Sequence, residues 1–200
     1  MSLLEMLSQQ LGSDAVQQIS QQIGADPGST SKAISGALPM LVTALDRNTN
    51  DAGGAQALAG ALDRDHDGSI LDDVVGFLGQ GGNASMGAGI LGHILGGRQQ
   101  AGAQDAIGKM SGLNSGQVGQ LLTMLAPLVL GALGKQKRQN GLDGGGLSDL
   151  LGQERQRAEA VNPGAMGMLG KLLDRDGDGQ VGDELAQIGM GMLGKMFGGK

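Results

Sequence analysis

Two stretches of the chain share one pattern: QQIGADPGSTSKAISGALPMLVTAL at Gln21–Leu45 and KMSGLNSGQVGQLLTMLAPLVLGAL at Lys109–Leu133. A shift of 88 residues lays the first stretch on the second, so that Pro39 coincides with Pro127. The same shift aligns further residues without a gap: Gly24 with Gly112, Asp26 with Asn114, Leu45 with Leu133, Leu3 with Leu91, Leu7 with Leu95 and Ile19 with Ile107. Self-similarity at a fixed interval predicts a duplicated structural unit.

The residue spacing within each unit is typical of α-helices. Apolar residues recur every three or four positions, as at Leu4, Leu7 and Leu11. Gly24 is typical of a helix end, and Asp26 of the N-cap of the next helix. Alternation with a period of two, which would indicate β-strands, is almost absent. We therefore predict an all-α fold, a multihelical bundle built from two duplicated helical units.

The long apolar helix predicted in each unit contains a proline. Pro39 and Pro127 cannot donate a hydrogen bond to the carbonyl groups of Ser35 and Thr123, four residues earlier, so both helices should kink there. The hydroxyl groups of Ser35 and Thr123 are candidate partners for the freed carbonyl oxygens.

The composition sets the limits of the core. Two hundred residues, 40% of them hydrophobic, allow one domain or two small ones with a core. The chain has two Phe, no Trp and no Tyr, so the packing must come from aliphatic side chains and 11 Met, while 40 Gly raise the entropic cost of folding. No cysteine is present, which excludes disulfides, zinc–thiolate sites and a cysteine nucleophile.

Negative charge is concentrated in two stretches, DRDHDGSILDD at 63–73 and DRDGDGQVGDE at 174–184. Together they hold ten of the 20 Asp and Glu residues in a chain whose net charge is -6. Carboxylates held this close repel one another unless cations or protons neutralise them. A bound cation is therefore a candidate explanation for both stretches.

Both stretches resemble the calcium-binding loop of EF-hands. Such a loop has oxygen ligands at positions 1, 3 and 5, a glycine at position 6, a backbone carbonyl ligand at position 7 and an aliphatic residue at position 8. Gly68 and Ile70 in the first stretch, and Gly179 and Val181 in the second, fit positions 6 and 8. The predicted ligands at positions 1, 3, 5 and 7 are Asp63, Asp65, Asp67 and Ser69, and Asp174, Asp176, Asp178 and Gln180.

The last position departs from the EF-hand pattern. Val74 and Leu185 stand at position 12, where a bidentate acid is expected. Acids stand instead at positions 10 and 11, as Asp72 and Asp73 in the first stretch and Asp183 and Glu184 in the second. We expect each loop to close one residue early, through the acid at position 11, while the acid at position 10 acts through water or caps the exiting helix. Which acid of each pair binds is left open.

These features predict two Ca²⁺ sites, because so many carboxylates suit a larger ion than Mg²⁺. The alternative is that both stretches only form turns and helix caps.

The motifs ALPMLVTAL, LAPLVLGAL, ILGHILGG at Ile90–Gly97 and LLDRDGDG at Leu172–Gly179 resemble those of the YidB-like bacterial proteins of unknown function. The resemblance extends from the N-terminus to about Leu151, with the second acidic loop as an extension. It implies a multihelical fold and a bacterial source, and it implies no activity.

Composition shifts divide the chain into four parts. They are the first helical unit with its ion loop at 63–73 (residues 1–90), the second helical unit (91–151), a polar linker (152–163) and a C-terminal helix–ion loop–helix (164–200).

Enzymatic function is not expected. The only histidines, His66 and His93, are interpreted as surface or half-buried residues without catalytic partners. Neither a G-x-S-x-G elbow nor a phosphate-binding loop is present. An acidic chain without a basic patch or an aromatic platform also argues against nucleic acid as a partner.

The sequence gives few indications of a membrane or a compartment. Its longest apolar stretch, Leu121–Leu133, is too short to span a bilayer. The N-terminal MSLLEMLSQQLG has no signal-peptide pattern, which favours the cytoplasm and leaves export without a leader as an alternative. The end of the chain, ELAQIGMGMLGKMFGGK at Glu184–Lys200, is apolar on one side of a helix, so packing on the bundle, docking to a partner helix and weak contact with a membrane surface are its candidate roles.

Two functions follow as hypotheses. In the first, the protein is a calcium-binding, non-enzymatic structural or self-assembly module, whose partner is another copy of itself or another protein. In the alternative, it is a calcium-responsive module that binds a protein or peptide in a groove lined by methionine.

Overall fold

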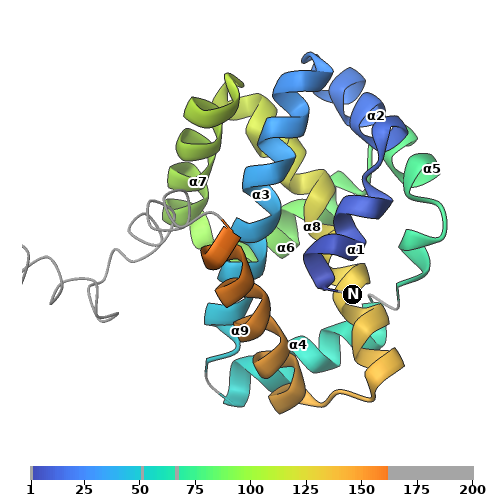
Figure 1. Ribbon diagram of the computed structural model, residues 1–200, viewed down its shortest axis with the longest axis vertical. Helices are drawn as coiled ribbons and strands as arrows, with labels where there is room; N and C mark the ends of the chain where they lie inside the picture. Colours follow the sequence, from blue (N-terminus) through green and yellow to red (C-terminus); the bar gives the residue numbers. More distant parts are fainter. Residues whose placement is uncertain (1, 51, 66–67, 162–200) are drawn as a thin grey trace, which may run out of the picture.

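The computed structural model describes residues 2–50, 52–65 and 68–161, which form nine α-helices and one short 3₁₀ helix, with no β-strand among these residues (Figure 1). The elements are α1 (Leu3–Gln10), α2 (Ser13–Ile23), α3 (Pro27–Asn48), α4 (Ala52–Asp65), η1 (Ser69–Leu71), α5 (Val74–Gly79), α6 (Ala84–Ile94), α7 (Gly96–Ser111), α8 (Ser115–Asn140) and α9 (Gly144–Val161). The prediction of an all-α, multihelical fold is confirmed.

The helix caps lie where the residue types indicate. The Asp26 side chain accepts a hydrogen bond from the Ser29 amide at 2.9 Å and starts α3. Asn114 starts α8 in the same way and forms a reciprocal capping box with Gln117. Gly24 and Gly112, at φ 64° and 84°, end the preceding helices in the left-handed conformation. These caps repeat at the interval of 88 residues, and a duplicated origin stays a prediction.

The centre of the protein is α8, which crosses the middle of the molecule in Figure 1. Every residue from Met124 to Gly134 is buried, so this part of the helix is covered on all sides. It packs against α6, α7 and α3, and also against α1. By length and composition α8 is able to cross a membrane, but 72% of its most apolar window is buried inside the protein, as in the core helix of a soluble bundle.

Both internal prolines lie inside helices that continue past them. The Ser35 hydroxyl donates to Ser31 O at 3.0 Å and the Thr123 hydroxyl donates to Gly119 O at 2.8 Å. The expectation that these hydroxyls bind the carbonyls freed by proline is therefore wrong, because each of them bonds one turn earlier. The predicted kinks stay a prediction.

The segment 152–161 is helical, so the prediction of a polar linker from residue 152 is wrong over these residues. It forms the second half of α9, which packs on α3 and α4. Glu154 is completely buried, and its carboxylate accepts hydrogen bonds from the Leu4 amide at 3.2 Å and from Arg157 at 2.7 Å. Arg155 donates to Asp46 of α3 at 2.8 Å. These bonds explain why a polar sequence packs here: its charged groups have partners on α9 itself and on α1 and α3.

Candidate functional site

The first acidic stretch, 63–73, joins α4 to α5. Asp63 and Asp65 lie in the last turn of α4, and Ser69 begins the 3₁₀ helix η1. Asp72 and Asp73 stand directly before α5. Position 5 of the predicted ion loop, Asp67, and its neighbour His66 lie outside the described residues.

Two lysines of α8 face this stretch. Lys137 forms an ion pair with Asp63 at 2.5 Å, and only 14% of the Lys137 side chain is exposed. Lys135 lies 4.0 Å from Asp72, whose side chain is 76% exposed. The repulsion expected between the carboxylates is therefore reduced by cationic side chains of the protein itself.

Asp73 caps α5. Its Oδ1 accepts a hydrogen bond from the Gly76 amide at 2.8 Å. Capping was one of the two roles expected for the acid at position 10, Asp72, but Asp73 caps this helix instead. The acid at position 11 is in the correct register to reach the third amide of the helix, as an N-cap does.

The turn of the loop rests on α8. Gly68 has φ 86°, and a Cβ atom there would lie 2.9 Å from Lys135 Cβ and 3.0 Å from the carbonyl oxygen of Gly131. Glycine is therefore required at this position both by conformation and by space. Ile70 packs on Gly131 so closely that a side chain on Gly131 would overlap it. Positions 6 and 8 of the ion-loop pattern thus hold the stretch against the core.

The described carboxylates do not converge on one point. Asp63 and Asp65 are two residues apart in a helix, so their side chains point about 200° apart. To face one ion, they would need the last turn of α4 to unwind. Over residues 2–50, 52–65 and 68–161, no group of three or more His, Cys, Asp or Glu is arranged to hold a metal ion. The second predicted loop lies outside these residues, with all of its candidate ligands: Asp174, Asp176, Asp178, Gln180, Asp183 and Glu184.

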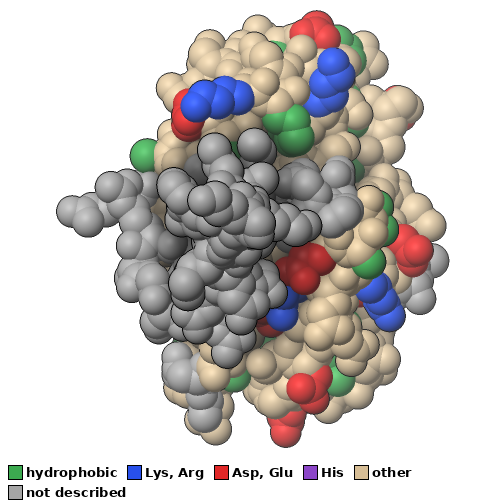
Figure 2. Space-filling model, turned by 60° about the vertical axis from the view of Figure 1, so that its left-hand side comes forward, with side chains coloured by type: hydrophobic (Ala, Val, Ile, Leu, Met, Phe, Trp, Pro, Cys, Tyr) green, Lys and Arg blue, Asp and Glu red, His purple; other side chains and the backbone are tan. Residues whose placement is uncertain are grey.

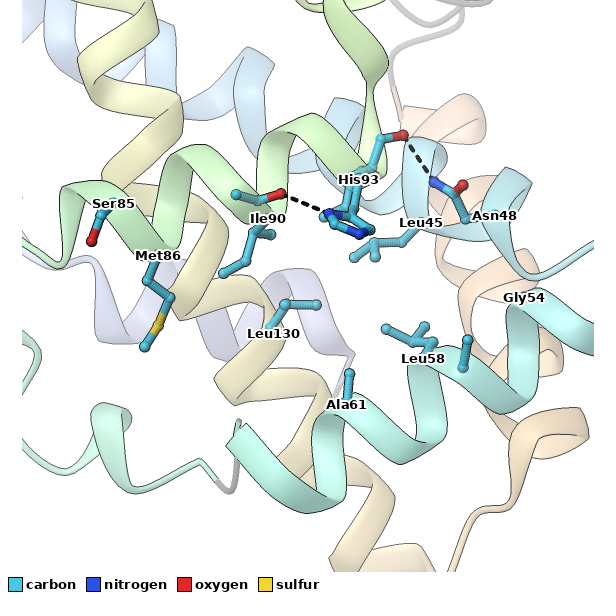
Figure 3. Close-up of a pocket in the computed structure, with 13 residues that line it drawn as sticks. Leu45, Asn48, Gly54, Leu58, Ala61, Ser85, Met86, Ile90, His93 and Leu130 are labelled. Carbon is cyan, nitrogen blue, oxygen red and sulfur yellow. Dashed lines mark hydrogen bonds between the residues drawn. The ribbon is translucent and has the colours of Figure 1, made fainter.

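A second candidate site is an apolar groove of about 440 Å³ between α4 and α6. Leu58 and Ala61 of α4 face Met86 and Ile90 of α6, and Leu130 of α8 lies between the two walls (Figure 3). Among the residues that the structure describes, none that lines the groove is Asp, Glu, Lys or Arg. Its size and apolar lining are typical of binding pockets.

Two polar side chains lie at the end of the groove near Ile94. His93 Nδ1 is 3.1 Å from the carbonyl oxygen of Gly89, and Asn48 donates to the carbonyl oxygen of Ile94 at 2.8 Å (Figure 3). The Asn48 bond joins the end of α3 to the end of α6. The Asn48 bond therefore holds the α6 wall of the groove to the end of α3.

The groove was not found from sequence, although α6 carries a signal for it. Gly87, Leu91 and Leu95 form the row that is buried in the core. Met86 and Ile90 belong to a second apolar row, and Met86 remains 39% exposed. Two apolar rows on one short helix indicate a second binding face.

Charged side chains form no large patch of one sign on the face shown in Figure 2. They stand there in small groups in which Lys or Arg often lies near Asp or Glu. Ion pairs also link Lys109 to Asp105 on α7, at 2.7 Å, and Arg155 to Glu159 on α9, at 2.6 Å. Surface charge of the described residues on this face therefore indicates no further binding site.

The sequence pattern of one family matches residues 5–136: the bacterial proteins of unknown function designated DUF937. The chain belongs to this family. The match runs from α1 through most of α8, so the DUF937 region includes the first acidic stretch and both walls of the groove. No curated protein matches the chain, and no solved structure does.

Proposed function

We propose that this DUF937 chain is a calcium-binding, non-enzymatic helical module with a structural or self-assembly role, and within the family we group it with the YidB-like proteins. The observation that carries the proposal is the packing of the first acidic stretch on α8: Gly68 and Ile70 hold the loop against Gly131. A cation bound by this stretch would brace α4 and α5 against the central helix. Its proposed partner is another copy of the chain or another protein.

Some features of the first acidic stretch favour a bound calcium ion and others oppose it. The left-handed Gly68 and the inward Ile70 match positions 6 and 8 of an ion loop. Against it, Asp63 is paired with Lys137, and the helical turn separates Asp63 from Asp65. Lys137 therefore competes with a cation for Asp63, and ordering the loop takes part of the binding free energy. We expect an affinity below that of an EF-hand whose ligands are preformed.

The test is a calorimetric titration of the full chain with Ca²⁺, with Mg²⁺ as the ionic control. D63A/D174A removes the first ligand of both loops. D105A is the matched control, because it removes a carboxylate that is paired with a lysine on α7 and belongs to neither acidic stretch. Two binding events that are lost in D63A/D174A and kept in D105A would support the proposal. No heat with wild type, together with an unchanged melting temperature, would overturn it.

A second candidate function is favoured by the position of α4. This helix ends in the acidic stretch at Asp65 and also forms a wall of the apolar groove through Leu58 and Ala61. A cation that unwinds the last turn of α4 would move Ala61, one turn before Asp65. The groove would then bind a protein or peptide in response to calcium.

A hydrophobic dye distinguishes the two candidate functions. The calcium-responsive groove predicts that Ca²⁺ increases dye binding, whereas the structural module predicts unchanged or decreased binding. Gly89 lines the groove and Gly92 does not, and a Cβ atom would meet nothing within 4 Å at either position. Gly89→Leu should therefore abolish the increase by filling the groove, while Gly92→Leu should preserve it.

A further inference from the structure

The groove between α4 and α6 presents an apolar surface with one acidic residue at its end. Leu58, Ala61 and Asp65 follow one another at intervals of three and four residues, so they lie on the same face of α4. Leu58 and Ala61 line the groove, and Asp65 is exposed one turn beyond Ala61. An apolar segment that carries a positive charge at one side is the occupant whose chemistry matches this surface.

The chain itself contains such a segment. Leu185, Ile188, Met192 and Met196 are spaced by three or four residues, which places them on one face of a helix. Lys195 flanks this row. A volume of about 440 Å³ is too small for a whole helix, whose diameter is about 10–12 Å, but it admits the side chains of one helical face.

The point where α9 ends allows this segment to reach the groove. Gly144, at the start of α9, lies against Ala55 of α4, the lower wall of the groove in Figure 3, and α9 ends at Val161. The 23 residues 162–184 lie between this end and Leu185 and, when extended, span at most about 75 Å. A tethered segment also has an effective concentration in the millimolar range, which favours it over a separate molecule.

We propose that residues 185–197 dock as a helix in the groove of their own chain. Leu185, Ile188, Met192 and Met196 fill the groove, and Lys195 lies on the side of Asp65. The inference goes beyond the calcium-dependent function and does not require it, because it rests on the groove and the tail alone. It assigns the groove an intramolecular ligand that an external partner has to displace.

The absence of cysteine in the chain allows a direct test. Met86 is 39% exposed at the groove, and M86C is combined in the full chain with one cysteine in the tail, at 185, 187, 188, 192, 194 or 196. Disulfide formation under mild oxidation in dilute solution is followed by mass spectrometry. A disulfide requires the two Cβ atoms to come within about 4.5 Å, so its rate reports which tail positions face the groove.

The expected result is a helical pattern. Cysteines at 185, 188, 192 and 196 stand on the apolar face, whereas those at 187 and 194 point to the opposite side. At least one position of the first set should react about tenfold faster than 187 and 194, since only a docked helix orients its side chains. A flexible, undocked tail would react equally at all positions, and this result would overturn the proposal.

Two controls check that the fast reaction depends on the groove. M110C, on an exposed methionine of α7 outside the groove, should react slowly and without the pattern. Gly89→Leu should suppress the fast reaction, and Gly92→Leu should leave it intact, because only Gly89 lines the groove. Disulfide-linked dimers in place of intramolecular bonds would show that the tail of a second copy is the occupant, which would overturn the assignment to the same chain.

Calcium binding and tail docking can be tested independently of each other. The disulfide pattern is measured in the presence of a chelator and again with Ca²⁺. A helical pattern with the chelator supports tail docking even where calorimetry detects no calcium. Loss of the pattern under both conditions overturns tail docking and leaves calcium binding to its own titration.

Discussion

Gly87 of α6 lies directly against the carbonyl oxygen of Thr123 in α8, and a Cβ atom at Gly87 would overlap this oxygen. Thr123 stands four residues before Pro127, which has no amide hydrogen, so its carbonyl has lost its helical donor. This close approach of α6 to the central helix thus occurs where the hydrogen-bond ladder of α8 is interrupted. The Cα hydrogens of glycine are able to contact the freed oxygen as weak donors.

This contact predicts opposite effects for two glycine substitutions in the same helix. Gly87→Ala should lower the free energy of unfolding by about 1–3 kcal/mol, because the added methyl group forces α6 away from α8. Gly92→Ala meets nothing within 4 Å and should raise it by about 0.5–1 kcal/mol through helix propensity. Urea unfolding followed by circular dichroism measures both. Equal effects of the two substitutions would show that α6 does not approach α8 so closely.

The ion pair between Lys137 and Asp63 predicts how calcium affinity responds to substitution. Lys137→Met frees Asp63 and should tighten calcium binding about fivefold, which corresponds to about 1 kcal/mol for a partly exposed pair. Lys135→Met removes the same charge from the same helix, but its nitrogen lies 4.0 Å from Asp72, so the gain should be smaller. Calorimetric titration compares the two variants. A larger gain for Lys135→Met would place the cation at Asp72 instead of Asp63.

Glu154 predicts how α9 is held to the rest of the protein. Arg157→Met leaves the fully buried carboxylate with the Leu4 amide as its remaining partner and should destabilise the fold by about 3 kcal/mol. Lys109→Met is the matched control, because it breaks an exposed pair with Asp105 and should cost less than about 0.5 kcal/mol. Chemical unfolding measures both. Hydrogen exchange should also show earlier opening of α1 in the Arg157 variant, and unchanged exchange there would contradict the coupling of α9 to α1.

The features that the sequence predicted are those determined by near neighbours. Asp26, Asn114 and Gly112 act within one turn of their own helices, and their residue types alone locate the helix ends. The all-α fold follows from spacing in the same way. A turn at Gly68 was also predictable, because the pattern requires a left-handed residue there.

The features that the sequence did not predict depend on residues far apart in the chain. Lys137 is 74 residues from Asp63, and Leu4 is 150 residues from Glu154, so neither contact has a local signal. The polar composition of 152–161 suggested a linker, because partners on α1 and α3 were not visible in the sequence. The groove likewise depends on tertiary packing, because its walls α4 and α6 are distant in sequence from α8, on which both of them pack.

The stability of the protein should depend on pH through Asp26, the N-cap of α3, and the substitution Asp26→Asn should remove this dependence. Hydrogen bonding from the Ser29 backbone amide, as the main cause, lowers the pKa of Asp26 below its ordinary value of 3.8. A lowered pKa in the folded state means that the ionised cap contributes stability above pH 3.8 and loses it as the pH falls through the folded-state pKa.

Asp26→Asn keeps the cap, as Asn114 does in α8, but cannot titrate. The difference in melting temperature between wild type and Asp26→Asn should be constant from neutral pH to about pH 5 and should shift against wild type below about pH 4. Thermal unfolding across this range measures the difference, and a constant difference down to about pH 2.5 would show that the Asp26 carboxylate does not stabilise α3 through its charge.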